Sequence, residues 1–551
     1  MLLTKFFSSL DKIYPETEWE EASPEAAGVM LSNERYSFQL GYRFDRLNTT
    51  VKVQVLPENE AISLRRVGLV PAAYVRPVDA DDNFEKTMPG MFPDPLFPLE
   101  DGKLLLCANG ANALWITVDG EKLSGGKERK EEENMDIRIR FLQDGENGEE
   151  ILAEAVYHLT VLPARLPEQK LLFTQWFHSD CLAHWYRVPV FSQEWWQRVD
   201  QYLACAKKNG LNLILTPIFT PPLDTAVGKE RLTVQLAAVK KEEDGYTFDF
   251  SNLQKWIGIC RKNGILHFEI SHLFTQWGAG FAPKIVADVD GKQVRIFGWE
   301  TKADSPEYTA FLDTFLPELV SFLEKEGILD SCFFHISDEP RTEHLASYTS
   351  ANEIVRKHIG DSKIMDAISD YDFYENGLID LPVCSTNHIH PFLEKKTEPL
   401  FAYYCCGQTR GTANRLFGMP QVRNRCIGVQ MYASGVQGFL HWGYNYWLSP
   451  GSQYPIDPYA VTDCERTFPG GDSFSVYPTE EGPVESARQV VFYEALQDVR
   501  LLELMEEKLG RQRVETLLAD WPYLAFDTSP RSAEEFLKLR GRLIDAVRTL
   551  A

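Results

Sequence analysis

The sequence predicts a multidomain protein in which an N-terminal β-sandwich precedes a (β/α)8 TIM-like barrel with C-terminal helices. Three observations predict this fold: strand-like alternation up to residue 165, eight apolar runs separated by amphipathic stretches from residue 166, and helical periodicity after residue 511. The chain of 551 residues also exceeds what one hydrophobic core normally holds. We expect domains at residues 1–165, 166–510 and 511–551, the last a helical extension packed on the barrel.

The first 165 residues read as short strands joined by turns. Apolar and polar residues nearly alternate in five segments, which is the pattern of strands with one face toward a core, and Asp119-Gly120 has the composition of a tight turn. The segments are residues 36–43, 50–56, 113–118, 137–141 and 157–162. Several strands without a helical period favour a β-sandwich. Pro163 and Pro167 mark the linker into the next domain.

From residue 166 the pattern changes to alternating strand and helix. Eight short runs rich in apolar or β-branched residues cover residues 171–177, 211–216, 266–270, 332–336, 363–368, 381–385, 400–404 and 438–442. Amphipathic stretches separate most of them, at residues 192–208, 252–262, 308–326, 342–358 and 415–434. Eight strands that alternate with helices are the expectation for a closed parallel barrel.

The residues that follow the runs are polar or aromatic. In a parallel barrel the active site lies at the carboxyl ends of the strands, so these residues are expected to share one rim. The fourth run ends in Asp338 and Glu339; the others contribute His178, Asp180, Asp224, His272, Asp370, Tyr403, Tyr404, Trp442, Tyr444, Asn445 and Trp447. Helix capping would explain Asp338, and core packing would explain His272 or Trp447, but convergence on one rim favours a pocket.

Two long loops, residues 217–250 and 273–304, are expected to form walls of that pocket. Each contains hairpin-like alternation, at residues 231–236 and 293–297. Trp277 and Trp299 in the second loop are candidate wall residues, with scaffold packing as the alternative.

Composition excludes several classes of partner. A net charge of -24 argues against nucleic acid, because binding to phosphates depends on Lys and Arg. No apolar run approaches a membrane span, and no apolar segment of the required length marks a secretory signal. Ten cysteines without CxxC spacing suit a reduced, cytoplasmic protein. His388 and His390 lack a clear third ligand, so we expect no metal and no cofactor.

Asp338 and Glu339 together point to acid–base chemistry. Two crowded carboxylates raise one of their two pKa values, which produces a neutral acid beside an anion. Aromatic and polar neighbours suit a sugar ring, and glycosidases use such a couple. Adjacent residues cannot easily flank a glycosidic bond from opposite faces. We therefore expect substrate-assisted catalysis, in which a 2-acetamido oxygen attacks the anomeric carbon, Asp338 polarises the amide and Glu339 is the general acid and base.

Residues 332–340, which read Cys-Phe-Phe-His-Ile-Ser-Asp-Glu-Pro, resemble the catalytic strand of glycoside hydrolase family 123. Further segments similar to that family follow in the same order along the chain: residues 175–182, 220–225, 435–447, 470–478 and 488–500. The resemblance implies a β-sandwich and a (β/α)8 barrel, and a retaining exo-glycosidase that releases terminal β-linked N-acetylgalactosamine through an oxazoline. It implies a small glycoside or oligosaccharide glycan as substrate, without cofactor or metal.

Two other functions remain open at this point. The first is a conventional retaining β-glycosidase for another sugar, with Glu339 as acid and base and Asp224 or Asp370 as nucleophile. The second is a barrel that binds glycans without cleaving them. The sequence leaves a homo-oligomer open.

Overall fold

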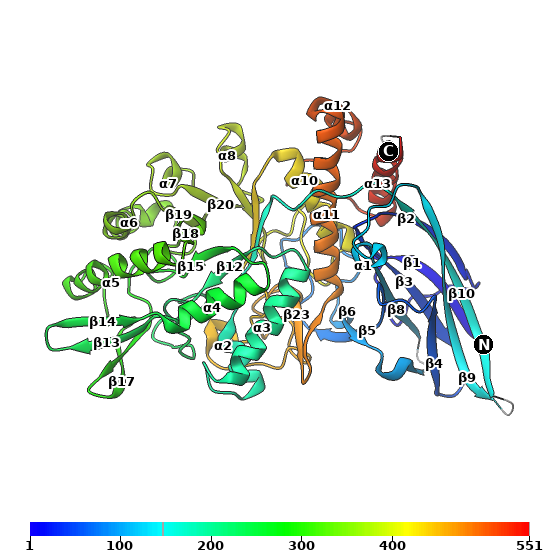
Figure 1. Cartoon of the computed structure of the whole chain (residues 1–551), viewed down its shortest axis with the longest axis horizontal. Coiled ribbons are helices and arrows are strands. Elements are labelled where there is room, and N and C mark those ends of the chain that lie inside the picture. Colours follow the sequence, from blue (N-terminus) through cyan, green and yellow to red (C-terminus); the bar gives the residue numbers. More distant parts are fainter. Residues whose placement is uncertain (109, 146–147, 550–551) are drawn as a thin grey trace. The chain divides into compact units, whose positions relative to one another are not determined.

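The computed structural model describes residues 1–108, 110–145 and 148–549, which form two compact units (Figure 1). The first unit comprises Met1–Gln169, Thr409–Ser434 and Val484–Ala551. The second comprises Lys170–Gln408 and Gly435–Pro483. These bounds differ from the consecutive domains expected from the sequence, because two later segments of the chain group with its N-terminal part.

Two five-stranded sheets make up the N-terminal, sheet-rich part of the first unit. One has the order β1-β3-β8-β5-β6 and the other β2-β10-β9-β4-β7, and only the β2–β10 pair is parallel. Their side chains share one core, in which Phe38, Ile116, Ile139 and Leu159 are almost fully buried. The strands are β1 (Leu2–Ser8), β2 (Glu25–Leu31), β3 (Arg35–Phe44), β4 (Thr49–Leu56), β5 (Ile62–Ala72), β6 (Gly90–Pro98), β7 (Lys103–Leu106), β8 (Ala111–Asp119), β9 (Glu133–Gly145) and β10 (Gly148–Leu162).

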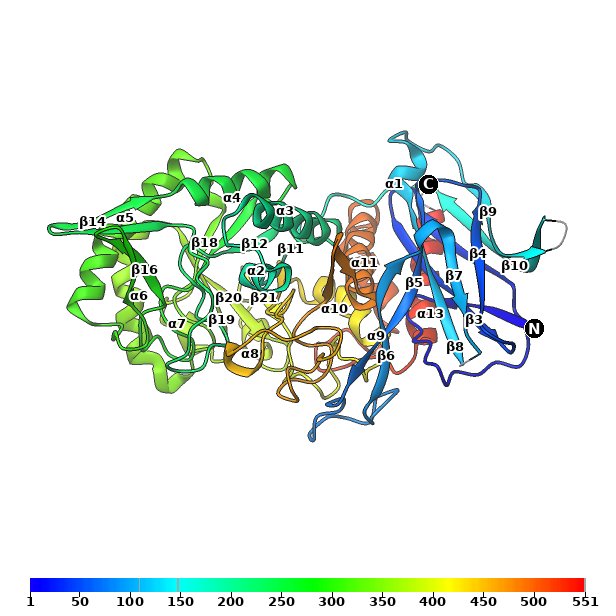
Figure 2. The ribbon, with the colours of Figure 1, turned by 90° about the horizontal axis from the view of Figure 1, so that it is seen from below.

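Helices α9 to α13 belong to the same unit, and Figure 2 shows α11 and α13 beside its sheets. Buried ion pairs explain the grouping. Arg488 of α11 binds Asp94 of β6 at 2.8 Å, although the two residues are far apart in sequence. The helices are α1 (Gly120–Ser124), α9 (Gln421–Arg425), α10 (Ile427–Ser434), α11 (Ala487–Leu509), α12 (Arg511–Leu518) and α13 (Ala533–Arg548). The amphipathic stretch expected at residues 415–434 contains two short helices, α9 and α10, and not a single one.

The second unit contains an eight-stranded sheet in which all paired strands are parallel, in the order β11-β22-β21-β20-β19-β18-β15-β12. Each of the eight predicted runs contains one of these strands: β11 (Leu172–Gln175), β12 (Leu213–Thr216), β15 (His267–Ile270), β18 (Cys332–Phe334), β19 (Lys363–Ile368), β20 (Leu381–Ser385), β21 (Phe401–Tyr403) and β22 (Gly438–His441). Asn212 links the two edge strands of this sheet. It directly precedes β12, and its N–H donates to the carbonyl of Phe173 in β11 at 3.1 Å. The sheet is a nearly closed barrel.

The helices of this unit differ greatly in length. Helices α3 to α6 have 12 to 20 residues and lie outside the sheet (Figures 1 and 2), whereas α7 and α8 are single turns. Their bounds are α2 (Ser179–Tyr186), α3 (Gln193–Lys208), α4 (Ser251–Lys262), α5 (Pro306–Lys325), α6 (Leu345–Ile359), α7 (Asp372–Glu375) and α8 (His390–Glu394). Ser192 and Ser305 cap α3 and α5 by accepting a backbone N–H.

The two long loops form a small four-stranded sheet, β14-β13-β16-β17. The hairpin expected at residues 231–236 is wrong, because Arg231 in that segment is drawn into a buried ion pair with Asp180. The hairpin lies instead at β13 (Ala238–Glu242) and β14 (Gly245–Asp249). The second hairpin is confirmed as β16 (Ile285–Val289) and β17 (Lys292–Phe297). The remaining strands are β23 (Val476–Thr479) and β24 (Gly482–Glu485).

Within the described residues, none of the helices combines the length and apolar character needed to cross a bilayer.

Candidate active site

A pocket of about 140 Å³ in the second unit brings five of the predicted site residues together. They are Asp224, Asp338, Glu339, Tyr403 and Trp442. The wall is completed by Trp176, Leu223, Gln276, Trp277, Ala367, Cys405, Cys406, Leu440 and Phe468. Tyr403 closes β21, and Asp338 and Trp442 lie just beyond the carboxyl ends of β18 and β22, as the barrel geometry predicts.

Asp338 and Glu339 lie in an irregular segment between β18 and α6. The helix-capping interpretation of Asp338 is not supported, because α6 begins only at Leu345. The segment is held by the carbonyl of Asp338, which accepts the N–H of Trp277 at 2.8 Å. Glu339 adopts a φ of 44°, a conformation that costs energy for a non-glycine residue and is concentrated at functional sites.

The charge on Asp338 is strongly disfavoured. Burial, the adjacent Glu339 and the nearby Asp366 raise the pKa of Asp338 well above its usual range, and the positive charge of His335 works in the opposite direction. A carboxyl pair of this kind retains a proton to higher pH than an isolated Asp. The pair can therefore present an acid and an anion in the same pocket.

Tyr403 fixes the position of Glu339. Its hydroxyl donates a hydrogen bond to Glu339 Oε1. Burial raises the pKa of Tyr403 and the charge of Glu339 raises it further, so the hydroxyl keeps its proton. The other oxygen of Glu339 is left for the reacting group. Tyr404, the next residue, points away from the pocket and packs against Phe439 and His441, as the alternation of a strand requires.

Beneath the pocket, His335 lies between two buried carboxylates. Its Nδ1 lies 2.9 Å from Asp366 Oδ1 and its Nε2 lies 3.0 Å from Glu269 Oε2. Burial alone would lower the pKa of His335, but the hydrogen bonds to Asp366 and Glu269 outweigh it and raise the pKa to about 9. The ring is therefore an imidazolium at neutral pH, with both nitrogens donating.

Asp366 connects this buried group to the catalytic segment. Besides His335, it accepts the N–H groups of Ile336 at 3.0 Å and Ser337 at 3.3 Å and the Tyr348 hydroxyl at 2.6 Å. These bonds position the two residues directly before Asp338. A buried anion with this many donors is held rigidly.

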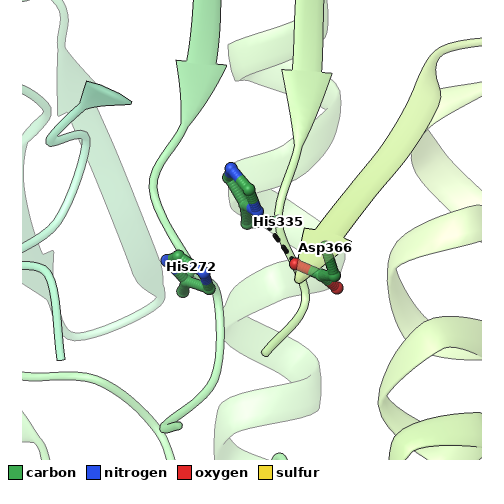
Figure 3. Close-up of side chains that lie close together, drawn as sticks. All are labelled: His272, His335 and Asp366. Carbon is green, nitrogen blue, oxygen red and sulfur yellow. Dashed lines mark hydrogen bonds and ion pairs between the residues drawn. The ribbon is translucent and has the colours of Figure 1, made fainter. Parts of the chain in front are cut away.

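His272, His335 and Asp366 are close enough to be considered as a metal site, and Figure 3 shows them on neighbouring segments. Both nitrogens of His335 are, however, bonded to carboxylates, and its ring stacks on that of His272 with centroids 4.3 Å apart. Burial and the charge of His335 keep the pKa of His272 well below its usual range. The geometry fits a charged ring stacked on a neutral one better than a coordination sphere.

Asp224 and Gln276 form another part of the pocket wall. The N–H of Asp224 donates to Gln276 Oε1 at 2.5 Å. Asp224 and Trp277 both have left-handed backbone conformations, with φ of 45° and 59°. Trp442 is oriented by its Nε1, which donates to Asp472 Oδ2 at 3.0 Å.

Three predicted residues form a structural cluster that does not line this pocket. Asp180 binds Arg231 through two hydrogen bonds of 2.7 and 2.9 Å, and although burial opposes its charge, Arg231 keeps the pKa of Asp180 low. His178 accepts from Arg231 and donates to the Trp442 carbonyl, while burial lowers its pKa to about 3. Asn445 binds the backbone of His178 through both amide atoms.

The other predicted residues also have structural contacts outside the pocket. Asp370 accepts the N–H and hydroxyl of Thr342. The Tyr444 hydroxyl donates to the Tyr202 carbonyl at 3.0 Å, and Trp447 packs edge-on against Trp185 and Tyr202. His272, described above, lies beneath the site. Their positions leave Asp224, Asp338, Glu339, Tyr403 and Trp442 as the predicted residues that reach the pocket.

Of the two tryptophans expected as walls, Trp277 lines this pocket and Trp299 lines a different depression. Several other wall residues were not among the predicted site residues. Trp176 and Leu440 belong to the runs themselves, so alternation along the strand could have identified them. Gln276 and Phe468 come from irregular loops, where no local pattern gives the direction of a side chain.

Comparisons with known proteins bear on the family and the fold. Residues 176–505 match the model of the glycoside hydrolase 123 catalytic domain. The fold is similar to that of a family 123 glycoside hydrolase from Clostridium perfringens, described in a study of glycolipid glycan hydrolysis, with a TM-score of 0.76, 15% identity and coverage of 100% of this chain and 98% of that chain.

Two further solved structures are much less similar to this chain. A β-glucuronidase from Bacteroides uniformis has a TM-score of 0.30 and 10% identity, over 86% of this chain and 48% of that chain. A family 5 mannosidase from Rhizomucor miehei has a TM-score of 0.33 and 11% identity, over 66% of this chain and 99% of that chain. No curated protein matches the sequence significantly. The match to the catalytic-domain model covers more than half of the sequence, and the chain belongs to glycoside hydrolase family 123.

Proposed function

We propose that this chain is a retaining exo-glycosidase that hydrolyses terminal β-linked N-acetylgalactosamine by substrate-assisted catalysis. Membership of family 123 supports glycosidase activity. The observation that carries the finer proposal is the pair of adjacent carboxyls, Asp338 and Glu339, in one pocket with the Tyr403 hydroxyl on Glu339. The printed description of the Clostridium perfringens structure, which concerns glycolipid glycans, supports a glycan as substrate.

In the first step, the acetamido oxygen of the sugar attacks the anomeric carbon and the bond to the leaving oxygen breaks. Glu339 gives its proton to that oxygen, while Asp338 accepts the amide N–H and stabilises the positive charge of the developing oxazolinium. In the second step, water attacks the anomeric carbon and Glu339 takes its proton. The bond to the acetamido oxygen breaks, and the sugar leaves with its original configuration.

The raised pKa of Asp338 means that the carboxyl pair retains a proton in the free enzyme. When the substrate's amide N–H donates to Asp338, it favours the Asp338 anion, so the retained proton passes to Glu339, which then gives it to the leaving oxygen. The Asp338 anion is stabilised further as positive charge develops beside it, so its interaction is stronger in the transition state than in the ground state. Tyr403 keeps Glu339 in a single orientation through both proton transfers.

The test is release of nitrophenol from β-linked aryl glycosides of N-acetylgalactosamine, N-acetylglucosamine, galactose and glucose. We expect cleavage of N-acetylgalactosaminides, and a loss of roughly 100-fold or more in kcat for Asp338→Asn and Glu339→Gln. A thiazoline mimic of the oxazoline should inhibit. Efficient cleavage of plain hexosides, or normal activity of Asp338→Asn, would disprove the mechanism.

A conventional retaining β-glycosidase is the second candidate, because Asp224 lines the same pocket as Glu339. Asp224 would then be the nucleophile, and Asp370, which binds Thr342 outside the pocket, is a weaker choice. A 2-fluoro sugar would trap Asp224 covalently in this case, and mass spectrometry of a digest would locate the label. A glycan-binding barrel without catalysis would bind sugars and cleave none of the panel.

We further propose that the nearly closed eight-stranded sheet is a (β/α)8 barrel with single-turn helices in two of its repeats. None of the ten cysteines, all of which lie in the described part of the chain, forms a disulfide, which supports a reducing, cytoplasmic setting. Cell fractionation of the native organism tests the location, and activity in its culture medium would contradict it.

A further inference from the structure

Gln276 and Asp224 carry buried polar atoms that have no hydrogen-bond partner among the residues that the structure describes. They are the Nε2 of Gln276 and the Oδ2 of Asp224, and both residues line the pocket that contains Asp338 and Glu339. Gln276 is only 5% exposed. A buried donor or acceptor without a partner destabilises the folded protein, so two such atoms in one pocket wall point to a compensating role.

The two residues are linked by a hydrogen bond from the backbone of Asp224 to the side chain of Gln276. The Asp224 N–H donates to Gln276 Oε1 at 2.5 Å, which commits the Gln276 oxygen and identifies its nitrogen as the free end. The free nitrogen can only donate, and the Asp224 carboxylate can only accept. Together they present one donor and one acceptor, which is the complement of a hydroxyl group or of two neighbouring hydroxyl groups.

The backbone around Gln276 is fixed by the catalytic segment. Trp277 N–H donates to the Asp338 carbonyl at 2.8 Å, and the Ser337 hydroxyl donates to the Thr275 carbonyl at 2.8 Å. The N–H of Ala279 donates to the same hydroxyl at 3.1 Å. Gln276 is therefore held in register with the residues that carry the two carboxyls.

The backbone around Asp224 is fixed independently. Its carbonyl accepts the Ser452 hydroxyl at 2.8 Å and the Tyr446 hydroxyl at 3.3 Å. Its φ of 45° is a strained conformation that these contacts maintain. Burial raises the pKa of Asp224, and the Tyr446 hydroxyl and the charge of Arg231 offset this rise only in part.

We propose that Asp224 and Gln276 form a recognition pair for sugar hydroxyl groups, in which a ring hydroxyl donates to Asp224 Oδ2 and the same or an adjacent hydroxyl accepts from Gln276 Nε2. The proposal rests on the proposed function and deepens it, because it identifies the residues that recognise the hydroxyl groups of the sugar ring, as distinct from its acetamido group. Asp224 is then a binding residue that never bonds covalently to the sugar. A site built to hydrogen-bond a hydroxyl discriminates strongly against an analogue that lacks it.

The experiment compares the parent aryl N-acetylgalactosaminide with its 3-deoxy, 4-deoxy and 6-deoxy analogues. For the wild type we expect kcat/KM to fall roughly 100-fold or more for at least one analogue. For Asp224→Asn and Gln276→Met the parent substrate should lose activity, and the discrimination at that same hydroxyl should shrink to about 3-fold or less, since the partner is already missing. Asp313→Asn, on a partly exposed part of α5, and Gln254→Met, on an exposed part of α4, are the matched controls and should keep full discrimination.

Binding provides a readout that does not need turnover. Trp176, Trp277 and Trp442 line the pocket, so the intrinsic fluorescence should report binding of the free monosaccharide and its deoxy forms. If the wild type binds the sugar but cleaves no glycoside, the proposed function fails while the pair is still tested by these affinities. If the enzyme cleaves only plain hexosides, the same deoxy series is built on that sugar.

Three outcomes would overturn the recognition pair. The first is a wild type that treats all the deoxy analogues and the parent alike, in both kcat/KM and binding. The second is unchanged discrimination in Asp224→Asn and Gln276→Met. The third is covalent labelling of Asp224 by a 2-fluoro sugar, which would make it the nucleophile.

Discussion

Buried charge is arranged in opposite ways in the first unit and in the pocket of the second unit. In the first unit, buried arginines are matched to carboxylates: Arg488 to Asp94, and Arg425 to Glu494 and Asp498. In the second unit, Asp338 is surrounded by Glu339, Asp366 and Asp224, all of which raise its pKa, and His335 supplies the opposing positive charge. Matched buried charge holds the first unit together, whereas the excess of carboxylates around Asp338 marks the place where chemistry is expected.

The difference also separates structural from functional strain. An ion pair whose partners satisfy each other gains nothing from an external ligand. The barrel pocket combines a carboxyl with a raised pKa, left-handed residues such as Glu339 and Asp224, and unpartnered polar atoms. These features cost stability in the empty protein and become favourable only when a substrate supplies the missing charge or hydrogen bonds.

The largest expected effect lies in the first unit. Arg488→Met leaves Asp94 buried without its partner, and we expect a loss of about 3–5 kcal/mol in the free energy of unfolding, measured by denaturant titration. The double variant Arg488→Met with Asp94→Leu should recover most of this loss, because it removes both charges. Equal stability of the single and double variants would show that packing, and not charge matching, determines the effect.

The second prediction concerns His335 in the barrel. Its pKa of about 9 lies above the unfolded value of 6.5, so the folded state binds this proton more tightly. The stabilisation is fully present below pH 6.5 and is lost as pH rises through 9, with an amplitude of roughly 3 kcal/mol. Thermal melts from pH 6 to 10 should show this decline in the wild type.

His335→Gln provides the control for that window. It should be less stable at pH 6, because Asp366 and Glu269 lose the positive charge between them, and its stability should change much less between pH 6.5 and 9. A decline of the same size in His335→Gln would assign the titration to another group.

The third prediction tests the hydrogen bond between Tyr403 and Glu339. Tyr403→Phe removes a hydrogen bond to a carboxylate, which is worth about 1.5–3 kcal/mol, and we expect kcat to fall roughly 10-fold to 100-fold while KM changes little. Kinetics on the aryl glycoside that the wild type cleaves provide the measurement. Tyr186→Phe, whose hydroxyl bonds Tyr202 outside the pocket, should leave kcat unchanged. An equal effect of the two variants would contradict the positioning role of Tyr403.

The sequence was sufficient for the eight barrel strands because a buried parallel strand is a local signal, a short apolar run. It also predicted that Asp338 and Glu339, which directly follow such a run, would reach the pocket, and both line it. It placed Tyr403 and Tyr404 together on the rim, although alternation along a strand allows only one of them to face the pocket.

Long-range pairs explain what the sequence could not supply. The hydrogen bond between Arg488 and Asp94 groups α11 with the N-terminal sheets. No local pattern predicts a partner that lies so far away in the sequence. Gln276 likewise gains its significance only from its bond to Asp224. Local patterns predict elements, whereas the pairing of polar side chains depends on the completed fold.

The smallest expected effect is a gain in stability at the catalytic pair. The raised pKa of Asp338 means that the folded protein binds its proton more tightly than the unfolded chain does, so wild-type stability falls as pH rises from the unfolded value through the folded one. Asp338→Asn does not titrate. The free energy of unfolding of this variant should exceed that of the wild type least at acid pH, and the difference should grow to about 0.5–2 kcal/mol at neutral pH. Glycosidase activity should be lost. Denaturant titrations of both proteins at pH 4 and pH 7 measure the difference, and a variant less stable than the wild type at pH 7 would show that Asp338 is matched like the charges of the first unit.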